Sequence, residues 1–439
     1  MTAIKSTAVT SVIKDVFGRI QDDKLRRVAT NCLLSTLDTT IQWPDGNDPF
    51  VITGDIPAMW LRDSSCQLEP YIRFTGEDTV LKELIMGVIR RQVFYINEDP
   101  YANAFNPEPN NVQGFPHDCT DKNPWVYERK FELDSLCHPI RLWWLFWQTT
   151  HDRRIFSPDV LSSIYRIIDV FETEQDHDRS SYLFERPDAP LTDTLTFGGK
   201  GSPVAATGLI WSGFRPSDDA CTYHYLIPAQ MFAVVSLHML RELVKMGFSD
   251  DILVRRITDL ITLIQGAVDR FATVPHALYG DIWAYEVNGL GHYNLMDDAN
   301  VPSLLSLPFL GYCSLDSPQY KRTRRFVLSK HNPYFVESEL GSGVGSPHTP
   351  AGYFWPIAVM MQALTSDSET EKLSCVDMLL RTDADTGFMH ESIDAKNPQR
   401  YTRSWFAWAN SLFAELILRL MDVKSIQASP LLSETEARF

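Results

Sequence analysis

Residues 250–272 read DDILVRRITDLITLIQGAVDRFA and carry the pattern on which the expected fold depends. Apolar side chains recur at every third or fourth position of this stretch, namely Ile252, Ile257, Leu260, Ile261, Ile264, Val268 and Phe271. This spacing places them on one face of an α-helix, where they can pack against a core. The stretch therefore predicts a long amphipathic helix.

The same spacing recurs along the whole chain of 439 residues, beginning with a first helix that contains Val9, Val12, Ile13, Val16, Phe17 and Ile20. Further helices are expected at residues 24–38, 64–75, 78–98, 131–150, 158–175, 227–247, 250–272, 302–312, 319–329, 352–365, 368–382 and 404–422. About a dozen helices suit six helical hairpins that close into one toroid. No linker-like change in composition interrupts them, so the chain is predicted to form one all-α domain, residues 1–439, with long loops.

One loop is expected to contain a small β-hairpin. Residues 281–296 alternate between apolar and polar side chains around Asn288-Gly289, a pair that favours a type I′ turn. We therefore expect two short strands joined by a two-residue turn.

Composition and charge exclude several classes of partner. The formal net charge is −16, whereas nucleic acids and anionic membrane surfaces select basic patches. No run of eighteen apolar residues predicts a membrane-spanning helix. Aromatic residues make up 12% of the chain, including 11 Trp and 16 Tyr, which is enough to line a binding surface as well as a core. A neutral ligand fits this composition.

The cysteines and the first twenty residues predict a cytoplasmic protein. Seven Cys, without any Cys-x-x-Cys pair, indicate reduced thiols; a disulfide framework or a zinc site is not expected. Residues 1–20 do not have the pattern of a signal peptide, and the chain contains no glycosylation sequon.

Residues 210–228, IWSGFRPSDDACTYHYLIP, combine aromatic rings with Arg215 and the adjacent carboxylates Asp218 and Asp219. A sugar-cleaving site needs an apolar surface for a pyranose ring, a guanidinium for hydroxyl groups and a carboxyl group that can be held protonated. As an alternative, a Ser or Asp of this turn caps the helix that follows. These residues alone leave both interpretations open.

A second polar stretch, residues 54–67 (GDIPAMWLRDSSCQ), places Trp60, Arg62 and Asp63 at the start of an expected helix. A guanidinium beside a carboxylate can bind the vicinal hydroxyls of a sugar. In the alternative interpretation, Asp63 or Ser64 caps the helix and Arg62 is a buried ion-pair partner.

Two more stretches carry candidate groups. Residues 116–139 include Glu128, Lys130 and Asp134 among charges that could also be solvated surface, and the tryptophans that follow are expected in the core. Residues 387–410 contain Glu391, a natural second carboxylate for a glycosidase pair. The alternative for Glu391 is an exposed loop glutamate.

Together these stretches closely resemble glycoside hydrolase family 125, the exo-acting α-1,6-mannosidases. The resemblance rests on GDIPAMWLRD (54–63), FRPSDD (214–219), MHES (389–392) and WFAWAN (405–410), and it extends through DDANVPS (297–303) and HNPY (331–334). It implies an (α/α)6 barrel with its site in a central funnel and an inverting mechanism without a metal or other cofactor. By motif, Asp218 matches the general acid and Glu391 the general base.

Under this resemblance, protonated Asp218 would donate to the leaving oxygen, and its raised pKa would come from the neighbouring charge of Asp219. Ionised Glu391 would activate a water on the opposite face of the sugar, which requires carboxyl groups about 6.5–9.5 Å apart and gives β-mannose. The side chains expected to hold the sugar are Arg62, Asp63, Arg215 and His348, with Glu128, Lys130 and Asp134 as further candidates.

The expected substrate is thus a mannose-containing oligosaccharide, such as mannan or a trimmed N-glycan fragment. Two kinds of alternative stay open at this point. One is a calcium-dependent α-mannosidase or a glucoamylase-like hydrolase on the same barrel. The other is a mannoside-binding protein without catalysis. The state of assembly is left open.

Overall fold

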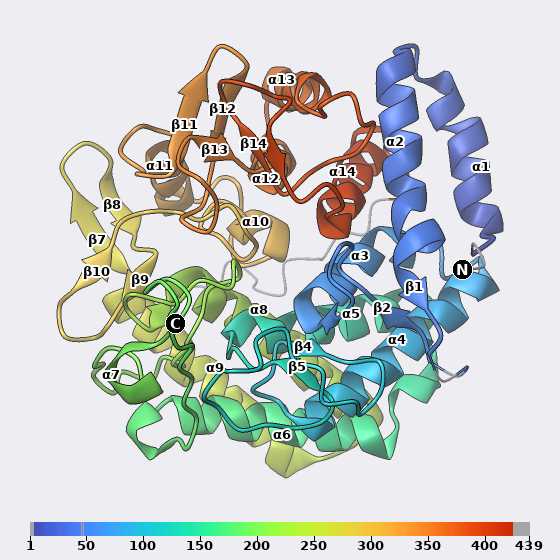
Figure 1. The fold of residues 1–439 in the computed structure, drawn as a ribbon. Helices are drawn as coiled ribbons and strands as arrows, with labels where there is room; N and C mark the ends of the chain where they lie inside the picture. Colours follow the sequence, from blue (N-terminus) through green and yellow to red (C-terminus); the bar gives the residue numbers. More distant parts are fainter. Residues whose placement is uncertain (1–3, 45, 47, 425–439) are drawn as a thin grey trace.

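The computed structural model describes residues 4–44, 46 and 48–424, and its long helices follow one another around a ring (Figure 1). The inner layer consists of α3 (Leu61–Ile72), α5 (Leu133–Thr150), α8 (Ile227–Gly247), α10 (Leu307–Leu310), α12 (Pro356–Leu364) and α14 (Ala407–Leu420). The outer layer consists of α2 (Asp23–Ser35), α4 (Thr79–Glu98), α6 (Pro158–Glu174), α9 (Asp251–Phe271), α11 (Pro318–Val327) and α13 (Glu369–Arg381). These helices form the expected (α/α)6 barrel. The single domain over residues 1–439 stays a prediction.

The apolar patterns explain which helix takes which layer. In α9 the inward stripe, including Ile257, Leu260 and Ile264, is buried, whereas Ile252 is 73% exposed. In α8 nearly every side chain is buried, because it packs on α5 and α9 at once. Among the helices of the described residues, α8 is the one that length and composition would allow to cross a membrane, and its apolar residues lie inside the barrel.

The remaining elements are short. Before the barrel lie α1 (Thr7–Asp15) and the 3-10 turn Phe17–Arg19; a π-helical turn, Thr36–Thr40, extends α2, two more 3-10 turns lie at Arg153–Ile155 and His177–Arg179, and α7 spans Thr196–Gly199. The strands are β1 (Ile41–Gln42), β2 (Phe50–Val51), β3 (Met59–Trp60), β4 (Ala104–Phe105), β5 (Val126–Glu128), β6 (Tyr225–Leu226), β7 (Thr273–His276), β8 (Gly280–Trp283), β9 (Glu286–Val287), β10 (Tyr293–Asn294), β11 (Phe335–Ser338), β12 (Gly341–Val344), β13 (Tyr353–Phe354), β14 (Ser392–Asp394) and β15 (Tyr401–Thr402).

The three-stranded sheets each contain a strand that leads into an inner helix. One has the order β3-β4-β5, and β3 leads directly into α3. In the sheet β10-β9-β6, β6 leads into α8, whereas β9 and β10 follow that helix in the chain; β13-β14-β15 joins the segments before α12 and α14. The polar stretches of the sequence therefore converge at the N-terminal ends of the inner helices.

Two local predictions were wrong in extent. The helix expected at 302–312 is reduced to α10, because the amides of Leu304 and Leu305 donate to the carboxylate of Asp297 in place of helix carbonyls. The expected hairpin exists as β9 and β10, but residues 288–292 connect them, so there is no two-residue type I′ turn. The Oδ1 atom of Asn288 accepts the amides of Leu290 and His292 instead.

The ring closes where the chain before α3 meets the start of α14. Gly54 forms an isolated bridge with Phe406, and the amide of Ala407 donates to the Thr53 carbonyl at 3.0 Å. Gly54 has φ = +132°, and a Cβ atom added there would lie 2.2 Å from the carbonyl oxygen of Trp405. A side chain cannot fit at this contact without moving backbone.

We expect Gly54→Ala to lower the free energy of unfolding by about 2–4 kcal/mol, through backbone strain and steric overlap. Urea unfolding followed by circular dichroism measures it. The matched control is Gly266→Ala, because Gly266 lies within α9 with no atom within 4 Å of an added Cβ. That variant should gain about 0.5–1 kcal/mol. Equal stabilities of the two variants would contradict this account of ring closure.

Candidate active site

The converging loops surround a cavity of about 580 Å³. Seven of the expected site residues line it, namely Arg62, Asp63, Glu128, Lys130, Asp218, His348 and Glu391. Aromatic rings of Trp60, Tyr127, Trp355 and Phe406 also line it. The cavity thus combines flat apolar surfaces with charged groups, as a sugar site requires.

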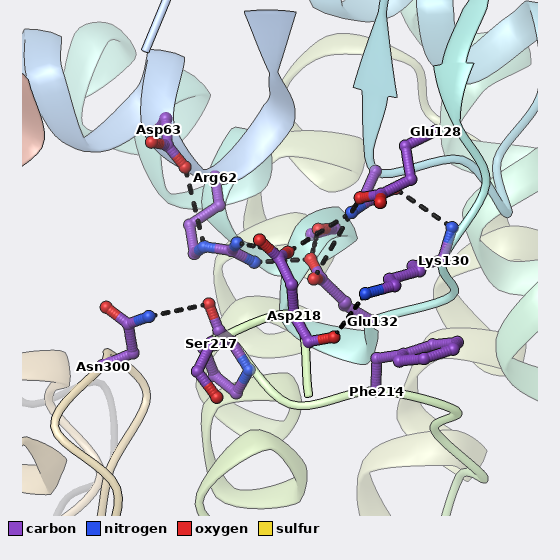
Figure 2. A network of polar contacts seen from close by, with 12 residues as sticks. Arg62, Asp63, Glu128, Lys130, Glu132, Phe214, Ser217, Asp218 and Asn300 are labelled. Carbon is purple, nitrogen blue, oxygen red and sulfur yellow. Dashed lines mark hydrogen bonds and ion pairs between the residues drawn. The ribbon is translucent and has the colours of Figure 1, made fainter. Parts of the chain in front are cut away.

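Arg62 is the centre of a buried polar cluster, which Figure 2 shows with its neighbours. Its Nη1 atom lies 2.5 Å from Glu132 and 3.3 Å from Asp134, and its Nη2 atom lies 3.2 Å from Asp218. Asp63 lies 3.7 Å from its Nε atom. Arg62 is therefore both a buried ion-pair partner and a cavity residue, so the two sequence interpretations describe one group.

The capping interpretations are wrong for both polar turns. The N-cap of α3 is Trp60, and the N-cap of α8 is Leu226, in each case without a side-chain hydrogen bond. The hydroxyl of Ser217 instead donates to Asp298 at 2.8 Å. Of the carboxylates in these turns, Asp63, Asp218 and Asp219 line the cavity.

Asp218 is held toward the cavity by a strained turn. Its φ of +68° lies in the left-handed region, which is costly for a residue other than glycine. The Asp218 amide donates to the carbonyl of Arg215 at 2.9 Å, and Lys130 donates to the Asp218 carbonyl at 2.7 Å. The side chain stays 28% exposed. A strained residue held by several contacts at a cavity is a strong candidate for function.

The expectation of a raised Asp218 pKa through Asp219 is wrong. Burial acts to raise the pKa of Asp218, but a hydrogen bond with Glu132 and the cations Arg62 and Lys130 hold it below its ordinary value. In Glu132, burial and the neighbouring Asp218 raise the pKa well above the ordinary range. Asp219 has little influence on Asp218, because its Oδ1 atom is paired with His348 Nδ1 at 2.9 Å.

Glu391 is not an exposed loop glutamate. It is 6% exposed, lies just before β14, and lines the cavity. The amide of Met389 donates to Asn410 of α14 at 2.9 Å, which fixes this loop to the inner helix. Arg403 Nη1 lies 3.7 Å from Glu391 Oε1.

Arg215 and Asp134 lie behind the cavity and do not line it. Arg215 donates from Nε to Glu286 of β9 at 2.6 Å, which fixes the turn that carries Asp218. Asp134 is fully buried beneath Arg62. Burial raises its pKa to about 6, against the lowering effect of Arg62. Both residues therefore support the groups that reach the cavity.

Glu128 and Lys130 line the cavity but already have charged partners. Glu128 pairs with Arg186 at 2.8 Å, and Lys130 pairs with Asp193. The prediction that residues of this stretch are solvated surface is wrong for both, because each is buried.

Several buried polar atoms of cavity residues have no hydrogen-bond partner. They are Trp60 Nε1, Arg62 Nε, Asp219 Oδ2 and Asn300 Oδ1. An unsatisfied buried donor or acceptor is costly, so atoms of this kind at a cavity are suited to ligand hydroxyl groups.

Sequence reasoning missed Glu132, Asn300, Trp355 and Arg403 as parts of the site. Glu132 stands two positions before Asp134 in a stretch that was already a candidate, and Asn300 lies in the 297–303 motif. Their polar character beside apolar helix starts was the available signal. In residues 4–44, 46 and 48–424, no group of three or more His, Cys, Asp or Glu side chains is arranged to hold a metal ion.

His348 provides a test of the electrostatics. Burial acts to lower its pKa, but the hydrogen bond and charge of Asp219 raise it to about 9. The folded-state pKa exceeds the ordinary value of 6.5, so the pair contributes stability fully below pH 6.5 and loses it as pH rises through about 9.

We expect histidine NMR to give a pKa near 9 for His348 and a clearly lower value in Asp219→Asn. His138, whose burial lowers its pKa to about 3, is the internal control and should not move. The stability difference between wild type and Asp219→Asn should shrink from pH 6 to pH 10. An unchanged His348 titration in the variant would contradict the pairing.

Comparison with known proteins relates the chain to one family. The family model described as metal-independent alpha-mannosidase (GH125) matches residues 22–418. The chain is 41% identical over 441 residues to the meiotically up-regulated gene 157 protein of Schizosaccharomyces pombe (strain 972), covering 95% of this chain and 86% of that protein.

The comparison with solved structures agrees with this family. A Streptococcus pneumoniae protein, described among metal-independent alpha mannosidases as a non-productive substrate complex with alpha-1,6-mannobiose, superposes with a TM-score of 0.93 and 42% identity. The match covers 96% of this chain and 100% of that one. A bacterial glucoamylase complexed with acarbose has a TM-score of 0.59 and 12% identity, over 94% of this chain and 58% of that one, and shows the fold alone.

Proposed function

This chain belongs to glycoside hydrolase family 125, the metal-independent α-mannosidases, and we propose that it removes terminal α-1,6-linked mannose from mannan or N-glycan fragments with inversion of configuration. The observation that carries the proposal is that Asp218 and Glu391 line one cavity from separate loops, before α8 and before β14. The mannobiose bound to the pneumococcal relative supports the linkage. Because the family is metal-independent, a calcium-dependent mannosidase is no longer a suitable alternative.

In the proposed reaction, Asp218 gives a proton to the glycosidic oxygen as its bond to C1 breaks. Glu391 takes a proton from a water that attacks C1 from the opposite face, so the product is β-mannose. Arg403 Nη1 lies 3.7 Å from Glu391 Oε1, whereas Asp218 faces Glu132, Arg62 and Lys130. We assign the separate acid and base roles to these different surroundings.

The terminal sugar would bind against the rings of Trp60 and Trp355, with its hydroxyls on the unpartnered atoms of Trp60, Asp219 and Asn300. We propose that the buried Arg62 cluster closes the cavity beyond Asp218. A closed end that binds one terminal sugar would give exo-action, because a continuing chain would have no room there.

We expect Asp218→Asn and Glu391→Gln each to lower kcat on α-1,6-mannobiose by at least about 100-fold while binding of the disaccharide persists. Steady-state kinetics and titration calorimetry measure the two effects. Circular dichroism spectra should match the wild type. Near-normal turnover in either variant would remove that residue from its assigned role.

The stereochemistry of the product is a separate test. Proton NMR at early times should show β-mannose released from α-1,6-mannobiose, at the same rate with and without EDTA. Initial α-mannose would mean retention and a different role for Glu391. Inhibition by EDTA would contradict metal independence, and no cleavage would point to another linkage.

A further inference from the structure

The charge balance around Arg62 requires a bound proton. Four carboxyl groups, from Asp63, Glu132, Asp134 and Asp218, lie within 3.7 Å of this one guanidinium. Three of them are at most 6% exposed at their side chains, and Asp218 is 28% exposed. Like charges this close cannot all be ionised in a buried site, so at least one carboxyl group stays neutral.

Glu132 and Asp218 share the same donors. Arg62 donates to Glu132 from Nη1 and to Asp218 from Nη2, which places the two carboxyl groups side by side. Asn103 Nδ2 lies 3.4 Å from Glu132 Oε1 and 3.5 Å from Asp218 Oδ1. The Asn103 amide thus lies between the same two carboxyl groups.

The hydrogen bonds of Glu132 indicate which of its oxygens carries the proton. Its Oε2 atom accepts from Arg62 at 2.5 Å and from Ser135 at 2.6 Å. Oε1 accepts only a long contact of 3.4 Å from Asn103 Nδ2, which makes its shortest bond to Glu128 Oε2 at 3.0 Å. Oε1 is therefore the position for a proton, on the side that Asn103 shares with Asp218. The raised proton affinity of Glu132 and the lowered affinity of Asp218 agree with this arrangement.

We propose that Glu132 and Asp218 share one proton, stored on Glu132 in the free enzyme and passed to Asp218 when a mannoside occupies the cavity. Glu132 is a positioning residue, because it is fully buried, does not line the cavity and acts through Asp218. The inference rests on the proposed function, in which Asp218 is the acid.

The proton balance closes over one turnover. The proton of Glu132 moves to Asp218, and Asp218 gives it to the glycosidic oxygen as the C1–O bond breaks. One proton of the attacking water goes to Glu391 as its oxygen bonds to C1. After product release, Glu391 loses a proton to solvent and the Glu132–Asp218 pair regains one, so the net reaction consumes one water.

Charged groups on several neighbouring elements surround the pair. They are Arg62 and Asp63 on α3, Glu128 on β5, Lys130 before α5, Asp134 on α5, Asp193 in the loop before α7, Asp219 next to Asp218, His348 before α12, and Arg403 before α14, which acts on Asp63. None of these changes in Glu132→Gln, so the variant removes one titrating group from an otherwise intact cluster.

The test is Glu132→Gln assayed on two mannosides with different leaving groups. Gln keeps the shape of Glu132 and can accept from Arg62, but it cannot give up a proton. On α-1,6-mannobiose, whose leaving alcohol needs protonation, kcat/KM should fall at least about 100-fold. On 2,4-dinitrophenyl α-mannoside, whose leaving phenolate needs none, it should change by less than about threefold.

The alkaline limb of the mannobiose pH profile provides a second readout. In the wild type this limb reports loss of the shared proton, and in Glu132→Gln it should move to lower pH, because Asp218 alone faces Arg62, Lys130 and His348. The matched control is Glu174→Gln, since Glu174 is a fully buried carboxylate that pairs with Tyr101 and His177 away from the cavity. Glu174→Gln should leave unchanged both the ratio of the kcat/KM values for the two mannosides and the position of the alkaline limb.

Each other outcome overturns the inference. An equal loss on both substrates would mean that Glu132 only holds Arg62 in place. If Glu132→Gln changed neither the ratio of the kcat/KM values for the two mannosides nor the position of the alkaline limb, Asp218 would receive its proton without Glu132. If the wild type cleaved neither mannoside, the proposed function itself would fail, which the wild-type assay shows before any variant is compared.

Discussion

The site depends on one buried guanidinium. Arg62 at the start of α3 contacts Glu132 and Asp134 at the start of α5 and Asp218 in the turn before α8. Removing one member of such a buried cluster typically costs about 3–5 kcal/mol, because the remaining charges lose their partners. Arg62 therefore joins three consecutive inner segments of the ring and sets the charge of the cavity at the same time.

The barrel topology explains why these segments meet. The segments that line the cavity lie before or at the start of inner helices, so polar residues from distant parts of the chain meet at one site. Arg62 lies in the first turn of α3, Asp218 in the loop before α8 and Glu391 in the longer segment before α14, and more than 150 residues separate each from the next. The bridge between Gly54 and Phe406 brings the first and last of these segments into contact.

Sequence periodicity predicted nearly every long helix, since an apolar stripe must be buried whatever the connectivity. It failed at 302–312, where the carboxylate of Asp297 takes backbone amides that a helix would have used. The motif resemblance brought most site residues to the cavity, but Arg215 and Asp134 lie behind it. Whether a polar side chain lines the cavity or lies behind it depends on three-dimensional packing, which a sequence motif does not describe.

The direction of the pKa shift of Asp218 is a second property that the sequence pattern did not predict. Adjacent aspartates suggest mutual repulsion, yet His348 neutralises Asp219, while Arg62 and Lys130 favour ionised Asp218. In the proposed mechanism, the proton for Asp218 is held by the neighbouring carboxyl group that is more deeply buried, which is Glu132. A sugar that covers Asp218 removes water from the exposed part of its side chain, whereas Glu132 has no exposed surface left to lose. Under the proposed mechanism, substrate binding therefore raises the proton affinity of Asp218 relative to that of Glu132, so that Asp218 receives the proton when a glycosidic oxygen is present to accept it.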